Sequence, residues 1–186
     1  MNSFFELVQK RYSCRNYSDK KVEKEKILSC LDAARLAPSA CNKQPCRFII
    51  VSDDQIRRNI CAQGLLPGIN MSWLEKAPII AVLCVETSLL PHQIAPLVSG
   101  INYHYVDAGI AGEHFVLQAE ELGLGTCWIG WFNEKSVKRI LKIPKHIKAV
   151  SLIALGYSEQ NIEIQQKDRK QITDISHNNL WGKKFS

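Results

Sequence analysis

Two arginines and a serine lie within five residues of one another near the N-terminus. The segment reads Arg11-Tyr12-Ser13-Cys14-Arg15. Alternate side chains of an extended segment point the same way, so Arg11, Ser13 and Arg15 would share one face. Two guanidinium groups and a hydroxyl can together bind a phosphate or a carbonyl edge through charge-assisted hydrogen bonds. The alternative interpretation is two ordinary surface arginines after a helix.

A second candidate is the loop at residues 38–45, which reads PSACNKQP. Its two prolines, Pro38 and Pro45, limit the freedom of the backbone, and its small residues allow a ring system to approach closely. Asn42 and Gln44 offer both donors and acceptors, which suits a planar ligand with polar edges. The loop could equally be an ordinary helix-to-strand turn in which serine and asparagine satisfy backbone groups.

Two further segments could complete a site. Residues 125–130 read GTCWIG, and glycines at both ends would let backbone amides approach a ligand. The other interpretation is a buried core strand in which Trp128 packs. Lys167, Arg169 and Lys170 form a late basic cluster, which could bind an anion or be a solvated run of charge.

The composition is that of one globular domain of 186 residues, with 46% hydrophobic and 23% charged residues. At a net charge of +6 the basic residues look scattered, without a Lys/Arg block, so we predict no nucleic-acid partner. No apolar run reaches about 18 residues, so we predict no membrane segment. The N-terminus has no signal-peptide pattern.

The seven cysteines are odd in number and include no C-x-x-C pair. We therefore expect reduced, mostly buried thiols in a cytoplasmic protein rather than a disulfide framework. The five histidines are too dispersed for metal-ligand spacing.

Hydrophobic patterns and capping signals predict alternating helices and strands. Helices are expected at about residues 3–10, 23–37, from 53 onward, 103–122 and from Asn133 to before Pro144. Strands are expected at 47–52, 78–85 and 149–157, with an extended segment at 125–130 and a loop or short lid at 86–102. The longest helix should be buried around much of its circumference and end at Gly123. Residues 158–186 are polar with spaced apolar side chains and must pack along another surface.

These elements fit either a parallel α/β sheet or an α+β layer, and composition does not choose between them. No G-x-G-x-x-G follows the first strand, and no G-x-x-x-x-G-K-[ST] occurs in the chain. A nucleotide-type ligand would have to be held by side-chain charge and irregular loops.

Taken together, the motifs resemble those of the nitroreductase family of FMN-dependent oxidoreductases. The family's R-x-S-x-R and P-S-x-x-N-x-Q-P forms occur at 11–15 and 38–45. They are followed in order by Asp107 in a helix, by LGLGTCWIG at 122–130 and by a late Arg-Lys pair, so the similarity spans about residues 4–181. Cys46 is a departure, because family members often have tryptophan after the second proline. Trp73 is another, near a position that some members fill with lysine.

The resemblance implies an α+β fold, in which a mixed, largely antiparallel sheet is flanked by helices. It also implies an intertwined homodimer with two FMN sites at the subunit interface. Residues 1–157 would form the FMN-binding domain, and residues 158–186 an arm that packs on the partner subunit.

The resemblance further implies roles for particular residues. A reduced flavin needs a donor near N5 and positive charge near N1 and O2. Ile129 and Gly130 would contact N5, and the FMN phosphate and the N1/O2 edge would be held by Arg11, Ser13 and Arg15. The remaining cofactor-binding residues would be Pro38, Ser39 and Asn42 from the other subunit, Gln44 nearby, Asn70 near the pyrimidine edge, and Arg169 or Lys170 at the phosphate.

The function expected on this basis is that of an FMN-dependent NAD(P)H oxidoreductase. NADH or NADPH would give hydride to flavin N5 and leave, and a small organic acceptor such as a nitroaromatic or quinone would then take the electrons. No side chain is nominated as an acid or base. One alternative is a flavin-binding or flavin-sequestering protein with little turnover. Another is an unrelated α/β interaction domain, which would be colourless.

Overall fold

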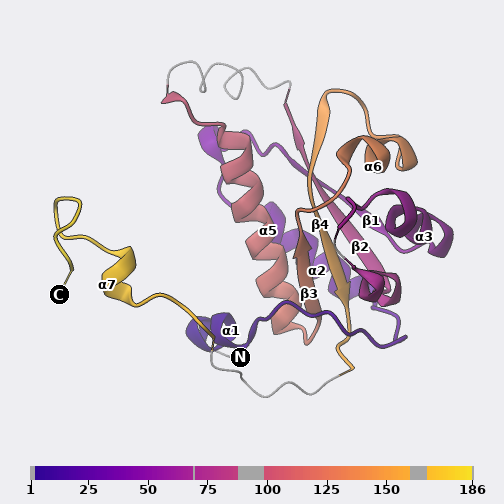
Figure 1. Ribbon diagram of the computed structural model, residues 1–186, viewed down its shortest axis with the longest axis horizontal. Helices are drawn as coiled ribbons and strands as arrows, with labels where there is room; N and C mark the ends of the chain where they lie inside the picture. The colour runs from indigo at the N-terminus through magenta and orange to yellow at the C-terminus, as the bar shows by residue number, and fades with distance from the viewer. Residues whose placement is uncertain (1–2, 69, 88–98, 160–166, 186) are drawn as a thin grey trace.

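The computed structural model describes residues 3–68, 70–87, 99–159 and 167–185 (Figure 1). The elements run in the order α1 (Phe4–Lys10), α2 (Lys24–Arg35), η1 (Ala40–Asn42), β1 (Cys46–Val51), α3 (Asp54–Gln63), η2 (Ser72–Lys76), β2 (Ile79–Glu86), α5 (Tyr103–Glu121), β3 (Gly125–Ile129), α6 (Glu134–Ile140), β4 (Ile147–Gly156) and α7 (Ile172–Ile175). No helix in these described ranges is long and apolar enough to cross a bilayer.

The sheet has four strands in the order β1-β2-β4-β3, and every neighbouring pair is antiparallel. The segment at 11–15 lies along the outer edge of β3. Ser13 forms a parallel bridge with Thr126, and the N–H of Cys14 donates to the carbonyl oxygen of Thr126 at 2.8 Å. The predicted mixed, largely antiparallel sheet flanked by helices is therefore confirmed.

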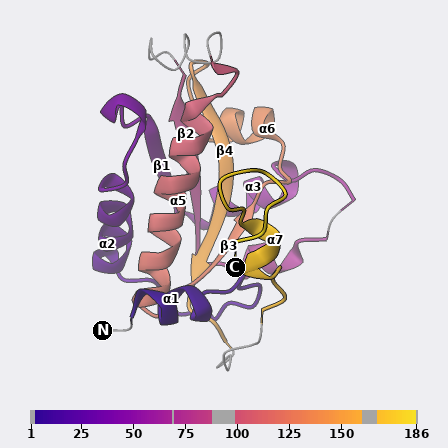
Figure 2. The ribbon, with the colours of Figure 1, turned by 90° about the vertical axis from the view of Figure 1, so that its left-hand side faces the viewer.

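Helices cover both faces of the sheet, with α2 and α5 on one side and α3 and α6 on the other (Figures 1 and 2). Successive residues of a strand point to opposite faces, and β2 is apolar on both. Ala81 packs in the cluster that includes Phe115 of α5. Val82, the next residue, packs in the cluster that includes Ile60 of α3 and Val137 of α6. The continuous apolar run of this strand therefore serves two cores.

Several local signals form as predicted. The N–H of Ser3 donates to Oε2 of Glu6 at 2.9 Å, and the N–H of Glu6 donates to Oγ of Ser3, which is the capping box of α1. Gly123 ends α5 with a φ of 73°. The N–H of Leu124 then donates to the carbonyl of Ala119 at 2.8 Å, so the turn satisfies the last carbonyls of the helix.

Other predictions need correction. Burial around much of the circumference of α5 is wrong for the single chain, because a stripe that includes Val106 (46% exposed) faces outward from the sheet. The predicted loop at 86–102 falls mostly on residues 88–98, which lie outside the described residues, and β2 continues to Glu86. By contrast, the expectation of free, mostly buried thiols is confirmed, because all seven cysteines are free, four are buried and Cys41 alone is exposed.

The described part of the C-terminal segment, residues 167–185, stands away from the body of the chain on the α5 side (Figure 1). Lys167 anchors its start, because Nζ donates to the carbonyl oxygen of Val8 at 2.7 Å and to that of Arg11. Trp181 further along is 91% exposed. The surface on which this arm was expected to pack is therefore not supplied by the described residues of its own chain.

Gly125 permits the close approach of the N-terminal segment to β3. A Cβ at this position would lie 2.8 Å from both Cβ and Sγ of Cys14. We expect Gly125→Ala to lower the free energy of unfolding by about 1–3 kcal/mol, because the segment at 11–15 must shift. Denaturant unfolding checks this. Gly130→Ala is the matched control, since its Cβ would meet nothing within 4 Å. Equal stability of the two variants would contradict the prediction.

Candidate functional site

The bridge to β3 sets which way the N-terminal motif points. Cys14 is buried against the sheet, whereas Ser13 and Arg15 on either side of it are exposed and Arg11 is half-buried. The alternation expected for an extended segment is therefore present. It leaves a hydroxyl and a guanidinium available to a ligand beside β3.

The charges of this motif act on β3 itself. Burial raises the pKa of the Cys127 thiol, and the charges of Arg15 and Arg11, together with a hydrogen bond to Ser13, oppose that rise. Both arginines thus bring positive potential to the strand that ends at Gly130. The arrangement can stabilise an anion or an electron-rich ring edge placed there.

The late basic cluster is only partly joined to this region. Burial lowers the pKa of Lys167, and the charges of Arg11 and Arg169 lower it further. Lys167 and Arg169 therefore lie in the electrostatic neighbourhood of Arg11. Lys170 is exposed.

Glu120 of α5 also belongs to this neighbourhood and was missed by sequence reasoning. Burial raises its pKa, and the charges of Arg11 and Lys167 oppose that rise. A half-buried carboxylate beside these cations fixes their position and offsets part of their repulsion. No specific signal in the sequence pointed to it, because α5 also carries Asp107, Glu113 and Glu121.

Gly130, at the end of β3, is open to a ligand. A Cβ there would meet nothing within 4 Å, so no contact within the described chain requires glycine. The loop before η2 runs beside it, because the N–H of Asn133 donates to the carbonyl of Gly64 at 2.7 Å and Nε1 of Trp131 donates to that of Pro67 at 3.3 Å. Ile129, just before, is buried.

Asn70 lies in this same loop. Its Oδ1 accepts from the N–H of Ser72 at 2.9 Å, which starts η2. The structure therefore brings the loop of Asn70 to the end of β3. The side-chain oxygen of Asn70 already accepts one hydrogen bond from within this loop.

The loop at 38–45 is backbone-strained. Cys41, Asn42 and Gln44 have φ values of 51°, 52° and 49°, in the left-handed region that non-glycine residues adopt at a cost of about 1–3 kcal/mol each. Internal bonds hold this shape, because Oγ of Ser39 accepts from the N–H of Gln44 at 2.9 Å and Nε2 of Gln44 donates to Oδ1 of Asn42 at 3.1 Å. The turn interpretation is therefore partly correct, although strain of this kind concentrates at functional sites.

Asp107 is a second residue whose role was not recognised from the sequence. It is buried in α5, and its Oδ1 accepts from the N–H of Ala40 at 3.0 Å. This bond ties the strained loop to the longest helix. Pro38, Ser39, Gln44 and Asp107 line one cavity of about 280 Å³, which extends between α2, β1 and α5.

The two halves of the predicted site lie at opposite edges of the sheet. The loop at 38–45 leads into β1, whereas the segment at 11–15 and Gly130 accompany β3. Neighbouring strands are about 4.8 Å apart, so three steps separate these edges by about 14 Å. A single chain does not bring both halves to one ligand ring.

Comparison with known proteins gives the same family that the motifs resemble. Residues 8–157 match the model of the nitroreductase family, and the chain belongs to this family. A nitroreductase family protein from Clostridium novyi is similar in structure, with a TM-score of 0.78, 29% identity and coverage of 99% of this chain and 98% of that one.

Two other relatives carry functional names. The structure of an FMN-dependent nitroreductase from Clostridium difficile is similar with a TM-score of 0.79 and 28% identity, covering 96% of this chain and 100% of that one. An FMN reductase [NAD(P)H] of Bacillus subtilis is 27% identical over 84% of this chain and 66% of its own length. The family as a whole supports an oxidoreductase.

Gly130 offers a test that separates binding from folding. We expect Gly130→Ala to leave the free energy of unfolding of the flavin-free protein within about 0.5 kcal/mol of wild type, because its Cβ enters open space. We expect the dissociation constant for FMN to rise about tenfold or more, since a methyl group would displace a close ligand. Fluorescence titration with FMN measures it, and unaltered affinity would contradict the assignment.

Proposed function

We propose that the protein is an FMN-dependent NAD(P)H oxidoreductase that reduces a small organic acceptor such as a nitroaromatic or a quinone. The observation that carries this proposal is the alignment of Ser13 and Arg15 with the open Gly130 along one edge of β3. FMN fits these residues because its phosphate and N1/O2 edge need cationic partners and its N5 needs a donor. The names of the relatives support the same cofactor.

In this proposal Arg11 and Arg15 bind the phosphate and the electron-rich ring edge, with Ser13 adding a hydrogen bond. The N–H of Ile129 or Gly130 faces N5, and the Asn70 loop lies along the pyrimidine side. Arg169 or Lys170 approaches the phosphate from the arm. When bound, the flavin supplies the redox chemistry, taking hydride from NADH or NADPH and passing electrons to the acceptor in a ping-pong sequence.

The second half of the site comes from a second chain. Pro38, Ser39, Asn42 and Gln44 would line the ring from the partner, because about 14 Å of sheet separates them from β3 within one subunit. The exposed face of α5 supports this homodimer, since Tyr105 and Val106 project from it. Gly109 on the same helix has open space where a Cβ would stand. Glycine inside a helix costs about 1 kcal/mol relative to alanine, which a close approach of a partner backbone would explain.

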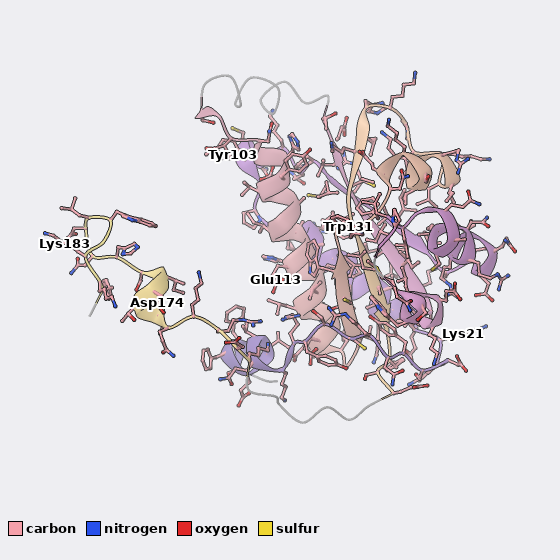
Figure 3. All side chains as sticks on the ribbon, in the orientation of Figure 1. Lys21, Tyr103, Glu113, Trp131, Asp174 and Lys183 are labelled. Carbon is pink, nitrogen blue, oxygen red and sulfur yellow. The ribbon has the colours of Figure 1, made fainter. Side chains whose placement is uncertain are left out.

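The arm at 158–186 is proposed to lie on the partner, and residues 1–157 to form the FMN-binding domain. Ile172, Ile175, Leu180 and Trp181 are exposed on the arm, which stands off on the side of the outward face of α5 (Figures 1 and 3). Burial of such side chains stabilises by about 1.5–3 kcal/mol each at most. We also retain a cytoplasmic location, which the seven free thiols support.

The proposed function predicts that the purified protein is coloured by bound flavin and catalyses NAD(P)H oxidation. Purified protein should absorb at about 370 and 450 nm, the bands that the cofactor supplies, and release FMN on denaturation. It should oxidise NADH or NADPH with a quinone or nitroaromatic acceptor, whereas a flavin-sequestering protein would bind FMN with little turnover. A protein that stays colourless with excess FMN and gains no thermal stability would refute the proposal.

Arg11→Ala should weaken FMN binding about tenfold to a hundredfold, because a charge-assisted bond is lost.

The arm makes a second prediction. Truncation after Tyr157 should weaken the dimer and also lower FMN content, because the apolar side chains and Arg169 leave together. The Arg169→Ala/Lys170→Ala double variant should lose flavin affinity but remain dimeric. Sedimentation and flavin content per chain measure the two effects. An intact, fully loaded dimer after truncation would exclude both roles of the arm.

A further inference from the structure

The positive charge of the chain is concentrated in residues 134–148, which include α6 and the start of β4. This segment holds six of the 24 lysines and arginines but one of the 18 acidic residues, so it contributes five of the six net positive charges. The expectation that basic residues are scattered is therefore wrong. The rest of the chain is close to neutral.

These side chains surround an open hollow of about 510 Å³ beside α6, here called the α6 hollow. Its lining consists of Glu134, Lys135, Lys138, Arg139, Lys142, Ile143 and Lys145. Two of these cations form hydrogen bonds within the fold. Nζ of Lys138 donates to the carbonyl of Ile147, and the Arg139 guanidinium donates to Oε1 of Gln63 at 2.8 Å. Lys142 and Lys145 are exposed at the rim.

The positive charge around the α6 hollow does not help the chain to fold, so it needs another explanation. The like charges of these lysines and the arginine repel one another, which destabilises the folded chain. The acidic residue of the segment, Glu134, lies at the edge of the hollow and approaches Lys148 at 3.9 Å, which offsets little of this repulsion. An anionic partner would offset the rest.

The chemistry of the lining favours a protein partner. Its described lining contains no aromatic side chain on which a base could stack, and the apolar residue in that lining, Ile143, is buried and cannot enter a bilayer. Lysine is a flexible, strongly hydrated point charge, and lysine-rich surfaces suit fast, salt-sensitive encounters with carboxylates spread over a partner surface.

The helix that borders the α6 hollow follows the proposed flavin site directly in the chain. Glu134 begins α6 four residues after Gly130, so the Cα of Lys135 lies within about 18 Å of that of Gly130. α6 and α5 cover opposite faces of the sheet (Figure 1), so a dimer formed through α5 leaves the hollow accessible.

We propose that the α6 hollow docks a small acidic electron-transfer protein that exchanges electrons with the flavin beside β3. This inference rests on the proposed function. Each carrier molecule would be oxidised by one electron, so two docking events and two protons from water would reduce one flavin fully. Such carrier complexes are weak and small, which agrees with the absence of an exposed apolar side chain from the described lining.

The test is an NMR titration of the isotope-labelled flavin-loaded protein with an acidic [2Fe–2S] ferredoxin. Signals of residues 134–148 should shift or broaden, and affinity should fall about tenfold or more between roughly 20 and 200 mM salt. Lys142→Gln/Lys145→Gln should weaken docking about tenfold. The control Lys21→Gln/Lys24→Gln removes the same charge far from α6, as the position of Lys21 in Figure 3 shows, and should bind as wild type.

Docking at the α6 hollow is overturned if nothing binds at low salt, if the signals of residues 134–148 are unaffected, or if both lysine pairs lose affinity equally. Tighter binding of a DNA duplex or of phosphatidylserine vesicles by the same residues also overturns it. The visible spectrum, which reports bound FMN, distinguishes failure of the docking proposal from failure of the proposed oxidoreductase function. A loaded protein that ignores ferredoxin refutes docking alone, whereas a protein that never takes up FMN refutes the oxidoreductase and the electron exchange with it.

Discussion

The backbone pairing between the N-terminal segment and the outer edge of β3 is the interaction on which the candidate site depends. The hydrogen bond from Cys14 to Thr126 fixes the direction of the segment, and the absence of a side chain at Gly125 allows it to come so close. Because Cys14 turns inward, Ser13 and Arg15 must turn outward, beside the open Gly130. Glu120 then offsets part of the positive charge that Arg11 and Lys167 bring to this edge.

Much of this arrangement could be predicted from local signals. The capping box at Ser3 and the glycine that ends α5 depend on neighbouring residues, so sequence sufficed to find them. Strands β1, β2 and β4 were recognised because each contains a continuous apolar run, whereas β3 was predicted only as an extended segment. The family resemblance added the sheet type, which periodicity alone left open.

Other features depend on contacts between segments that are distant in the chain, and such contacts cannot be recognised from a single sequence. Asp107 supports the loop through Ala40, 67 residues away, and looks like any acidic residue in a helix. The outward stripe on α5 was interpreted as core because Val106 and Ile110 are apolar, although the described residues supply no layer to cover Val106. The charge of 134–148 was overlooked because its lysines are separated by apolar residues that fill the core.

Separation of the two motifs across the sheet makes the second subunit a requirement for the proposed flavin site. The most direct measurement uses mixed dimers purified with two different tags. One chain would carry Arg11→Ala/Arg15→Ala and the other Ser39→Ala/Asn42→Ala, so that each homodimer lacks half of both sites. The account predicts that the mixed dimer binds one FMN, because one of its sites combines the intact halves. Mixed dimers that bind no more FMN than the parent homodimers would contradict a site shared between chains.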